Sequence, residues 1–455
     1  MAVQLFRHIG QCLTMAPAME KEGRHIVESD LGIISKAAML VVDGMILWIG
    51  PEKKLNAKGI QSLLDKYHEM ANAKPKSIAA KNLLNQKKSV RRNWQEIDCD
   101  QRTMLPGFVE CHTHSIFAGD RTAEFEWKMQ GVSYQEIAAR GGGILNTMQA
   151  TRQASSRELH LLTAQRVQNF LQQGVTALEI KSGYALNEKD EFKVLKILKK
   201  MQQPQQFGKK STAGPEIIST FLGAHAKPPE FATTSEYLDF LSGLLVKIKK
   251  QNLAERIDIF VESGFFSADI AEKYLQQAQR LGFATCIHAD QISLSGGTDL
   301  GLRMSSLSVD HVLQVDANLI NRLAQSAVTA VLLPTADLYM KCRYPNARQM
   351  IDAGVRVALA TDFNPGTAPS QDLTLVGLLA RLKMQMSLPE VISAYTVGAS
   401  FALNRQHKMG ALTSHREANF SLLTTDWTSL FYSPGATAIQ QVYRRGLAQF
   451  NAKRT

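Results

Sequence analysis

The sequence is poor in cysteine, and the cysteines it has follow no pairing pattern. Only five occur among 455 residues, at positions 12, 99, 111, 286 and 342. Their number is odd and no two are spaced as in a Cys-x-x-Cys motif. This argues against a disulfide framework and against a thiolate metal site. We therefore expect a protein of a reducing compartment and place it in the cytoplasm.

Long apolar runs are also missing. No uninterrupted stretch approaches the about 18 residues of a membrane span, so we expect a globular protein without a membrane partner. The first ten residues lack the apolar core and the cleavage site of a targeting segment, and we interpret them as a strand. The run Gly141-Gly142-Gly143 is not followed by the Lys-Ser/Thr pair of a phosphate-binding loop. A flexible active-site loop is the better interpretation of this run.

Positive charge is concentrated in one segment. The formal net charge is +11, and residues 51–92 hold 11 Lys and Arg against three acidic residues, or +8, which leaves +3 for the other 413 residues. A basic face for nucleic acid is therefore not indicated. We expect 51–92 to be a basic surface insertion, either a solvated helix or a disordered loop. The alternative is a patch that binds an anion or a partner.

After position 106, short apolar runs alternate with longer segments of helical period. This alternation predicts parallel β/α units. Helical spacing is clear in 158–173, 189–201, 235–250 and 268–281. The predicted strands number eight, which is enough to close a (β/α)8 TIM-like barrel: 108–111, 175–180, 216–222, 257–261, 283–287, 307–310, 328–333 and 355–361.

The two ends of the chain have a different pattern. Residues 38–50 contain two β-type runs around Asp43-Gly44, which predicts a hairpin. Further strand candidates are 420–423 and 441–446. Because 455 residues exceed what one compact core usually serves, we expect one large α/β domain and a smaller one.

Residues of the types that commonly bind metal ions lie at the ends of three predicted strands. His112 and His114 lie two apart at the end of the first strand, so both rings share one face. His288 ends the fifth strand and Asp362 the eighth, and such ends converge on one face of a barrel. Each residue alone could be a buried hydrogen-bonding group or a loop cap. Together, three nitrogens and one carboxylate oxygen predict a site for Zn²⁺ or a similar ion, with water as a further ligand.

The segments around these residues resemble the amidohydrolase superfamily and, within it, the imidazolonepropionase family. The resemblance covers about 104–403 and is weaker at both ends. Eight segments occur in the expected order, which chance does not readily produce. Besides the metal strands they include 117–121, Tyr134 with 140–144, 181–184, 221–225, 288–291, 310–311 and 361–367.

This resemblance implies a fold, a reaction and a cofactor. The barrel would occupy 104–403, and 1–103 with 404–455 would form a discontinuous small β-sandwich. The reaction is hydrolysis of a cyclic amide, 4-imidazolone-5-propanoate, to N-formimidoyl-L-glutamate in histidine degradation. One metal ion per subunit, zinc first and iron second, would supply activated water. Members of the family are usually homodimers.

The resemblance also implies the contacts of a small-molecule substrate. Arg121 offers a forked guanidinium to the propionate, and the loop of Asn364, Gly366 and Thr367 offers amides and a hydroxyl. Tyr184, His225 and Gln291 would contact the ring, and Tyr134 would complete the site. Two alternatives stay open at this point: Arg121 could form a surface ion pair with Glu124 or Glu126, and Tyr134 could simply pack.

The principal base is a choice between Asp362 and His311, because both are expected near the metal. His311 would otherwise polarise the developing oxyanion. Gln291 cannot transfer a proton as a glutamate would, which counts against the deaminases of the superfamily. Another cyclic amidohydrolase or deaminase remains the near alternative. An inactive barrel that binds a partner through the basic insertion is the alternative of another class.

Overall fold

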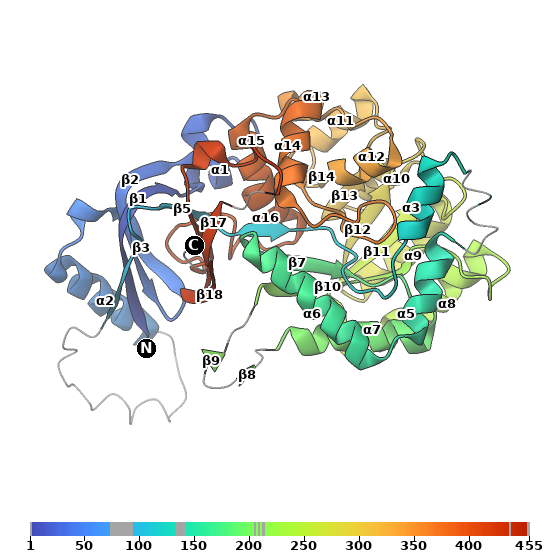
Figure 1. The fold of residues 1–455 in the computed structure, drawn as a ribbon, viewed down its shortest axis with the longest axis horizontal. Helices are drawn as coiled ribbons and strands as arrows, with labels where there is room; N and C mark the ends of the chain where they lie inside the picture. Colours follow the sequence, from blue (N-terminus) through green and yellow to red (C-terminus); the bar gives the residue numbers. More distant parts are fainter. Residues whose placement is uncertain are drawn as a thin grey trace.

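The computed structural model describes residues 2–72, 94–132, 136, 142–203, 206–207, 210–211, 214–435 and 438–452. Two large sheets organise the chain (Figure 1). One is a barrel surrounded by helices, and the other is built from strands of both chain ends, so that the two termini lie on the same side of the molecule. Among the described residues, no helix combines the length and the hydropathy that crossing a bilayer requires.

Eight parallel strands form the barrel, in the order β15-β14-β13-β12-β11-β10-β7-β6. Each of the eight predicted strands matches one of them with ends that differ by at most two residues, so the barrel prediction is confirmed. The strands are β6 (Phe108–Glu110), β7 (Val175–Lys181), β10 (Glu216–Ala224), β11 (Arg256–Val261), β12 (Ala284–Ala289), β13 (Ser308–His311), β14 (Thr329–Leu332) and β15 (Val357–Leu359).

The barrel is closed between its first and last strands by the segments that carry candidate ligands. The amide of Asp362 donates to the carbonyl of His112 at 3.1 Å, and that of His114 donates to Phe363 at 2.9 Å. The buried carboxylate of Glu110 accepts the amides of His112 and Thr361, both at 3.2 Å. Closure of the barrel therefore places His112, His114 and Asp362 side by side.

Helices cover the barrel and are fixed at their starts by side-chain caps. Ser155, Asn187 and Thr233 accept an amide of the first turn in α6, α7 and α8, as such residues do at helix N-termini. The outer helices are α3 (Thr122–Met129), α5 (Ile144–Gln153), α6 (Ser156–Gln172), α7 (Glu188–Met201), α8 (Thr234–Lys250), α9 (Ala268–Arg280), α10 (Gly297–Arg303), α11 (Ala317–Ala324), α12 (Pro334–Met340), α13 (Ala347–Asp352), α14 (Leu373–Lys383), α15 (Leu388–Ser393), the π-helix η4 (Ala394–Gly398) and α16 (Ala399–Ala402).

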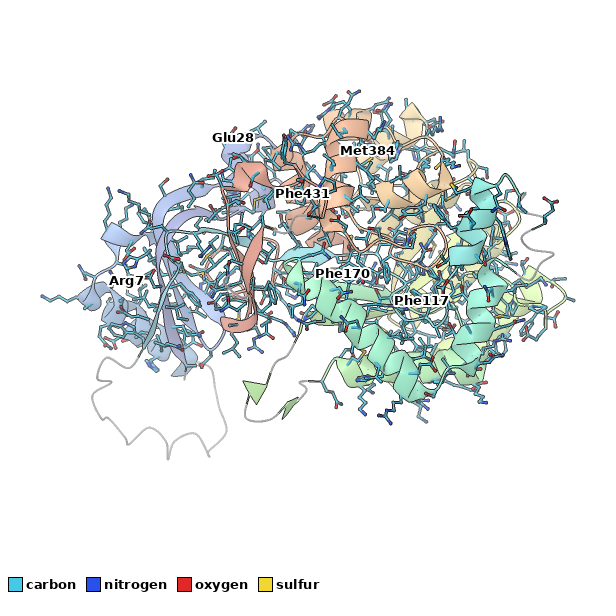
Figure 2. All side chains as sticks on the ribbon, in the orientation of Figure 1. Arg7, Glu28, Phe117, Phe170, Met384 and Phe431 are labelled. Carbon is cyan, nitrogen blue, oxygen red and sulfur yellow. The ribbon has the colours of Figure 1, made fainter. Side chains whose placement is uncertain are left out.

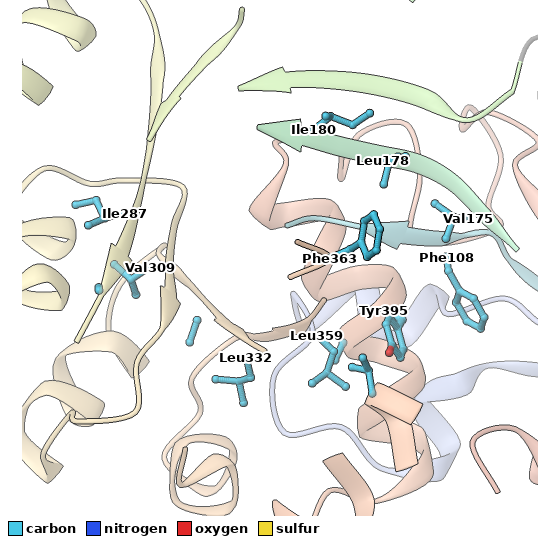
Figure 3. Packing of buried hydrophobic residues seen from close by; sticks show 14 of the residues in the cluster. Phe108, Val175, Leu178, Ile180, Ile287, Val309, Leu332, Leu359, Phe363 and Tyr395 are labelled. Atoms are coloured by element: carbon cyan, nitrogen blue, oxygen red, sulfur yellow. The ribbon is translucent and has the colours of Figure 1, made fainter. Parts of the chain in front are cut away.

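The largest apolar cluster lies between the barrel strands and these helices. Leu178 and Ile180 of β7 belong to it, as do Ile287 and Leu332 of strands on the other side of the barrel (Figure 3). Tyr395 of η4 contacts Phe108 at a ring distance of 5.5 Å and donates its hydroxyl to the carbonyl of Leu373 at 2.8 Å. Side chains fill the barrel region and the terminal sheet alike (Figure 2).

The second sheet combines both chain ends, as expected. Its strands follow the order β18-β17-β16-β5-β1-β2-β3, and β4 also pairs with β1. The predicted hairpin is present: β2 and β3 are antiparallel, and Asp43 and Gly44 turn with φ of 49° and 86°. The strands are β1 (Val3–Leu13), β2 (Ile33–Val42), β3 (Met45–Pro51), β4 (Gln95–Asp98), β5 (Thr103–Pro106), β16 (Phe420–Leu423), β17 (Ile439–Arg444) and β18 (Leu447–Asn451).

The basic insertion begins with a helix that packs on this sheet. In α2 (Ala57–Asn72), Ile60 and Leu64 are buried in a cluster with Val3 and Leu5 of β1. This part of the insertion is therefore not only a solvated helix, because one of its faces covers apolar strands. Residues 73–92 of the predicted insertion lie outside the described part of the chain. Short helices α1 (Ala16–Glu20), η1 (Glu28–Leu31), η2 (Glu52–Lys54) and η5 (Trp427–Ser429) complete the region.

Candidate active site

The four predicted ligands meet at the C-terminal end of the barrel. Asp362 Oδ1 lies 3.4 Å from His112 Nε2 and 3.3 Å from His114 Nε2. His288 Nε2 lies 3.4 Å from His114 Nε2. All four side chains are buried. Residues far apart in the sequence therefore bring three imidazole nitrogens and one carboxylate oxygen into neighbouring positions, linked by these pairwise distances.

These donor atoms fit a divalent cation. His112 Nε2 and Asp362 Oδ1 are buried without a hydrogen-bond partner. Ligand atoms lie within 4.8 Å of one another in two overlapping groups, His112 with His114 and Asp362, and His112 with His288 and His311. Orphaned polar atoms are costly in a protein interior unless something binds them. Imidazole and carboxylate together suit zinc, iron or manganese.

The charges at this point also favour a cation. Burial and the ammonium of Lys181 lower the pKa of His112, but the carboxylates of Asp310 and Asp362 outweigh them and raise it to about 9. Burial opposes ionisation of Asp362, yet the neighbouring imidazoles of His112 and His114 hold its pKa well below the usual range. A cation bound between these imidazoles would interact favourably with the ionised carboxylate of Asp362.

A second layer of charged residues lies beneath the histidines. His112 Nδ1 is 2.6 Å from Asp310 Oδ2, and His288 Nδ1 is 2.9 Å from Asp258 Oδ2. Lys181 Nζ lies 2.8 Å from Asp258 Oδ2. The sequence analysis assigned no role to these three residues. Charged residues lie two apart in β7 and in β11, but the sequence alone does not tell such a pattern from a solvent-facing one.

A cavity of about 790 Å³ opens over the histidines and contains most of the predicted substrate contacts. The predicted residues that line it are Arg121, Tyr184, His225, Gln291, His311, Asn364 and Thr367. Lys128, Phe260, Phe265 and Met340 were not predicted and also line it. Tyr134 lies outside the described residues.

Arg121 forms one of the ion pairs that the sequence left open, and it also lines the cavity. Its Nε donates to Glu124 Oε2 at 2.7 Å, so the predicted ion pair exists, but Arg121 and Glu124 are only 12% and 4% exposed. The second oxygen of Glu124 accepts the amide of Gly143 at 3.0 Å. The buried pair fixes the arginine at the cavity wall, where a guanidinium can bind a carboxylate in a forked geometry.

Gly366 makes room for this guanidinium. A Cβ atom at position 366 would lie 2.0 Å from Arg121 Nη1. The amides of Gly366 and Thr367 donate to Asn364 Oδ1 at 2.9 and 2.7 Å. These amides are therefore satisfied inside the loop. The loop lies directly against Arg121, and donation of its amides to a substrate carboxylate stays a prediction.

His225 is held as an acceptor that faces the cavity. Its Nδ1 lies 3.0 Å from the carbonyl of Gly183, which can only accept, so Nδ1 carries the proton. Burial and the neighbouring His114 and His288 lower the pKa of His225 well below its usual value. Its Nε2 is then a free acceptor. Tyr184 contacts the same ring at 5.2 Å.

Asp337 in α12 is a buried acid close to this site. Burial and the negative charge of Asp362 raise the pKa of Asp337 to about 8, from 3.8. A raised carboxyl pKa stabilises the fold below pH 4, and this contribution is lost as the pH rises toward 8. We expect Asp337→Asn to gain stability relative to the unmodified chain between pH 5 and 8, by the order of a few kcal/mol.

Urea unfolding at pH 5, 6.5 and 8 measures this difference. The exposed Asp239 gives the matched control, since Asp239→Asn should show no such trend. A stability difference for Asp337→Asn that stays constant over this pH range would contradict the prediction.

The whole chain is similar to curated imidazolonepropionases. It is 50% identical to that of Bdellovibrio bacteriovorus over 447 residues, which cover 98% of this chain and 96% of the relative. It is 35% identical to that of Bacillus cytotoxicus, with 97% and 95% covered. For Clostridium tetani the identity is 32%, with 97% of both chains covered. The amidohydrolase family model matches residues 253–447.

Solved structures with the same fold are more distant. The guanine deaminase of E. coli superposes with a TM-score of 0.65 at 14% identity, and both chains are covered completely. An adenosine deaminase from Xanthomonas campestris with bound zinc gives 0.65 at 13% identity, over 100% of this chain and 95% of that one. These likenesses establish the fold alone.

Proposed function

The chain belongs to the imidazolonepropionase family of amidohydrolases, and from this we propose that it hydrolyses 4-imidazolone-5-propanoate to N-formimidoyl-L-glutamate in L-histidine degradation. The observation that carries the proposal is a combination. Donor atoms of His112, His114 and Asp362 lie within 4.8 Å of one another, and His114, His288 and Asp362 line the same cavity as Arg121. A small ring that bears a carboxylate can then contact the bound cation and Arg121 at the same time.

We assign His112, His114, His288 and Asp362 as ligands of one metal ion per subunit. Zinc is our first choice and iron the second. When bound, the ion would lower the pKa of a water molecule and polarise the carbonyl of the ring. The family depends on metals, and the orphaned donor atoms described above support a site for one.

The residues of the chain supply proton transfer and orientation. We propose Asp362 as the principal base and His311 as the group that polarises the developing oxyanion. Burial lowers the pKa of His311 well below its usual value, so the ring is neutral near pH 7. The free Nε2 of His225 would accept a ring N–H, and Arg121 would bind the propionate. The ring amide opens when its nitrogen receives the proton that the base has taken.

Gln291 and Tyr184 would contact the ring, and Tyr134 stays a proposal from the sequence. The Gln291 amide donates to Met340 Sδ at 3.3 Å, so it is held at the cavity wall. An amide cannot shuttle a proton. This favours opening of the ring over deamination.

Three further features are proposals. We divide the chain into a barrel of 104–403 and a small domain of 1–103 with 404–455. We expect a homodimer, as is usual for the family. We place the protein in the cytoplasm, which is consistent with free and mostly buried cysteines.

The direct test is turnover of the imidazolone by purified protein of known metal content. Formation of N-formimidoyl-L-glutamate that depends on the metal supports the proposal. Release of ammonia from a purine or pyrimidine, without opening of the imidazolone, would replace it by a deaminase function.

Gly366→Ala tests the contact to the propionate. The new methyl group would overlap Arg121 Nη1, at the end of a side chain and not in the backbone, so the guanidinium should move and the fold should persist. We expect KM to rise about 10-fold with little change in kcat, because one charge-assisted contact is weakened. Gly243→Ala in α8 is the control, since a Cβ atom there meets nothing within 4 Å. An unchanged KM would remove Arg121 from the carboxylate site.

A further inference from the structure

A single ammonium group lies beneath the candidate metal centre. Lys181, the last residue of β7, is fully buried. Its Nζ lies 2.8 Å from Asp258 Oδ2, 2.9 Å from Glu179 Oε2 and 3.7 Å from Asp310 Oδ2. Buried charges are tolerated when they are paired in this way, and removal of one partner leaves the others uncompensated. The three carboxylates therefore share Lys181 as a cationic partner.

Two of these carboxylates each hold a different histidine of the metal centre. Asp258 Oδ2 is 2.9 Å from His288 Nδ1, and Asp310 Oδ2 is 2.6 Å from His112 Nδ1. His112 makes a hydrogen bond with its carboxylate, and His288 lies at ion-pair distance from its own. A carboxylate beside Nδ1 favours a proton on that nitrogen and leaves the lone pair of Nε2 for a metal. The same two Oδ2 atoms are the ones that face Lys181. The ammonium thus joins His112, which follows β6, to His288 of β12.

The backbone of Lys181 adds a third connection. Its amide donates to the carbonyl of Thr113 at 2.9 Å, and Thr113 lies between His112 and His114. The Thr113 hydroxyl in turn donates to the carbonyl of Glu179 at 2.6 Å. Glu179 has a second cation beside it, because Arg256 Nη1 lies 3.3 Å from Glu179 Oε1. Because Arg256 already compensates the charge of Glu179, the pairing with Glu179 alone does not explain why position 181 is a lysine.

We propose that Lys181 is a positioning residue that fixes Asp258 and Asp310, and through them orients His288 and His112 toward one metal ion. The inference rests on the proposed metal centre. It adds that one residue, Lys181, positions two of the metal ligands, His112 and His288. Lys181 does not touch the substrate or the metal in this arrangement. Its effect should therefore appear in metal binding before any turnover is measured.

The test is the affinity of the metal-free protein for Zn²⁺, measured by competition with a chelator, in K181M and in the unmodified chain. Methionine keeps the length of the side chain and removes its charge. Loss of an outer partner of a metal-binding histidine typically weakens the metal site 10- to 100-fold. We expect a loss of this size in K181M, with an altered visible spectrum of the Co²⁺-loaded protein, because the imidazoles are reoriented.

The matched control is K193M. Lys193 is also largely buried, donates to the carbonyls of Thr151, Arg152 and Ala154, and pairs with Asp190 in α7. It supports structure away from the histidines, so its loss should leave Zn²⁺ affinity and the Co²⁺ spectrum unchanged. If K181M binds Zn²⁺ as tightly as the unmodified chain, the proposal is overturned while the metal centre stands. If the unmodified chain does not bind Zn²⁺, the metal centre itself fails.

A second variant covers the case in which K181M does not fold. K181M/D258N removes one buried charge of each sign and is compared with D258N alone. Weaker Zn²⁺ binding by the double variant supports the proposal, since Lys181 then still acts on His112 through Asp310. Equal binding overturns it. Failure of both lysine variants to fold, with K193M folded, assigns Lys181 to folding and also overturns it.

Discussion

Asp362→Asn is expected to lower kcat by about 10³-fold or more and to reduce the bound metal. The carboxylate has two tasks in the proposed reaction. One oxygen, Oδ1, faces Nε2 of both His112 and His114, and the group also takes the proton from the attacking water. An amide is neutral and is a poor base, so both tasks fail together. Loss of a general base alone usually costs 10²- to 10⁴-fold, which sets the order of magnitude.

Steady-state turnover and elemental analysis of the same preparation measure the two losses. Asp352→Asn is the control, because Asp352 is exposed on α13, pairs with Arg348 at 2.7 Å and has no role in the proposed reaction. Retention of metal and of more than a tenth of the turnover in Asp362→Asn would show that Asp362 is neither an essential ligand nor the base.

The barrel and the ligands could be predicted because their signals are local. Each barrel strand is a short apolar run, and His112, His288 and Asp362 each follow or end such a run. Topology then brings strand ends together whatever the loops do. Because the apolar runs are local signals, the predicted strand ends differ from those of the structure by at most two residues.

The support of the site could not be predicted in the same way. Lys181, Asp258 and Asp310 gain their roles from contacts between neighbouring or opposite strands, and these depend on the stagger of the barrel, which no single strand encodes. In the sequence, a charged residue between apolar ones is equally typical of a solvent-facing position. A single sequence gives no means of deciding which face points inward.

Two other features needed packing information. The charge of the basic insertion indicated a solvated segment, but the burial of Ile60 and Leu64 depends on the apolar face of a sheet formed by distant residues. The loop after Asp362 was expected to offer amides to the substrate. In the structure, the side chain of Asn364 accepts hydrogen bonds from those amides. The sequence does not show whether the amides bind this side chain or a substrate carboxylate.

His311→Gln is expected to lower kcat by about 10²-fold or more with the metal retained, and it separates the two candidate bases. His311 has a φ of 79°, and Val312 follows with 50°. Such values are strained for residues with a Cβ atom, and strain of this kind is concentrated at functional sites. The buried Nδ1 of His311 has no hydrogen-bond partner. The backbone therefore holds a neutral imidazole at the site with one nitrogen ready to interact.

The pH dependence of kcat decides which group accepts the proton. Burial lowers the pKa of His311, and the neighbouring imidazoles of His112 and His114 lower that of Asp362. Either base is active when deprotonated, so kcat falls as the pH drops through its pKa. If Asp362 is the base, the acidic fall of kcat persists in His311→Gln at the reduced rate. Loss of that acidic fall would transfer the role to His311. The exposed His407 provides the control, because His407→Gln should change neither the rate nor the profile.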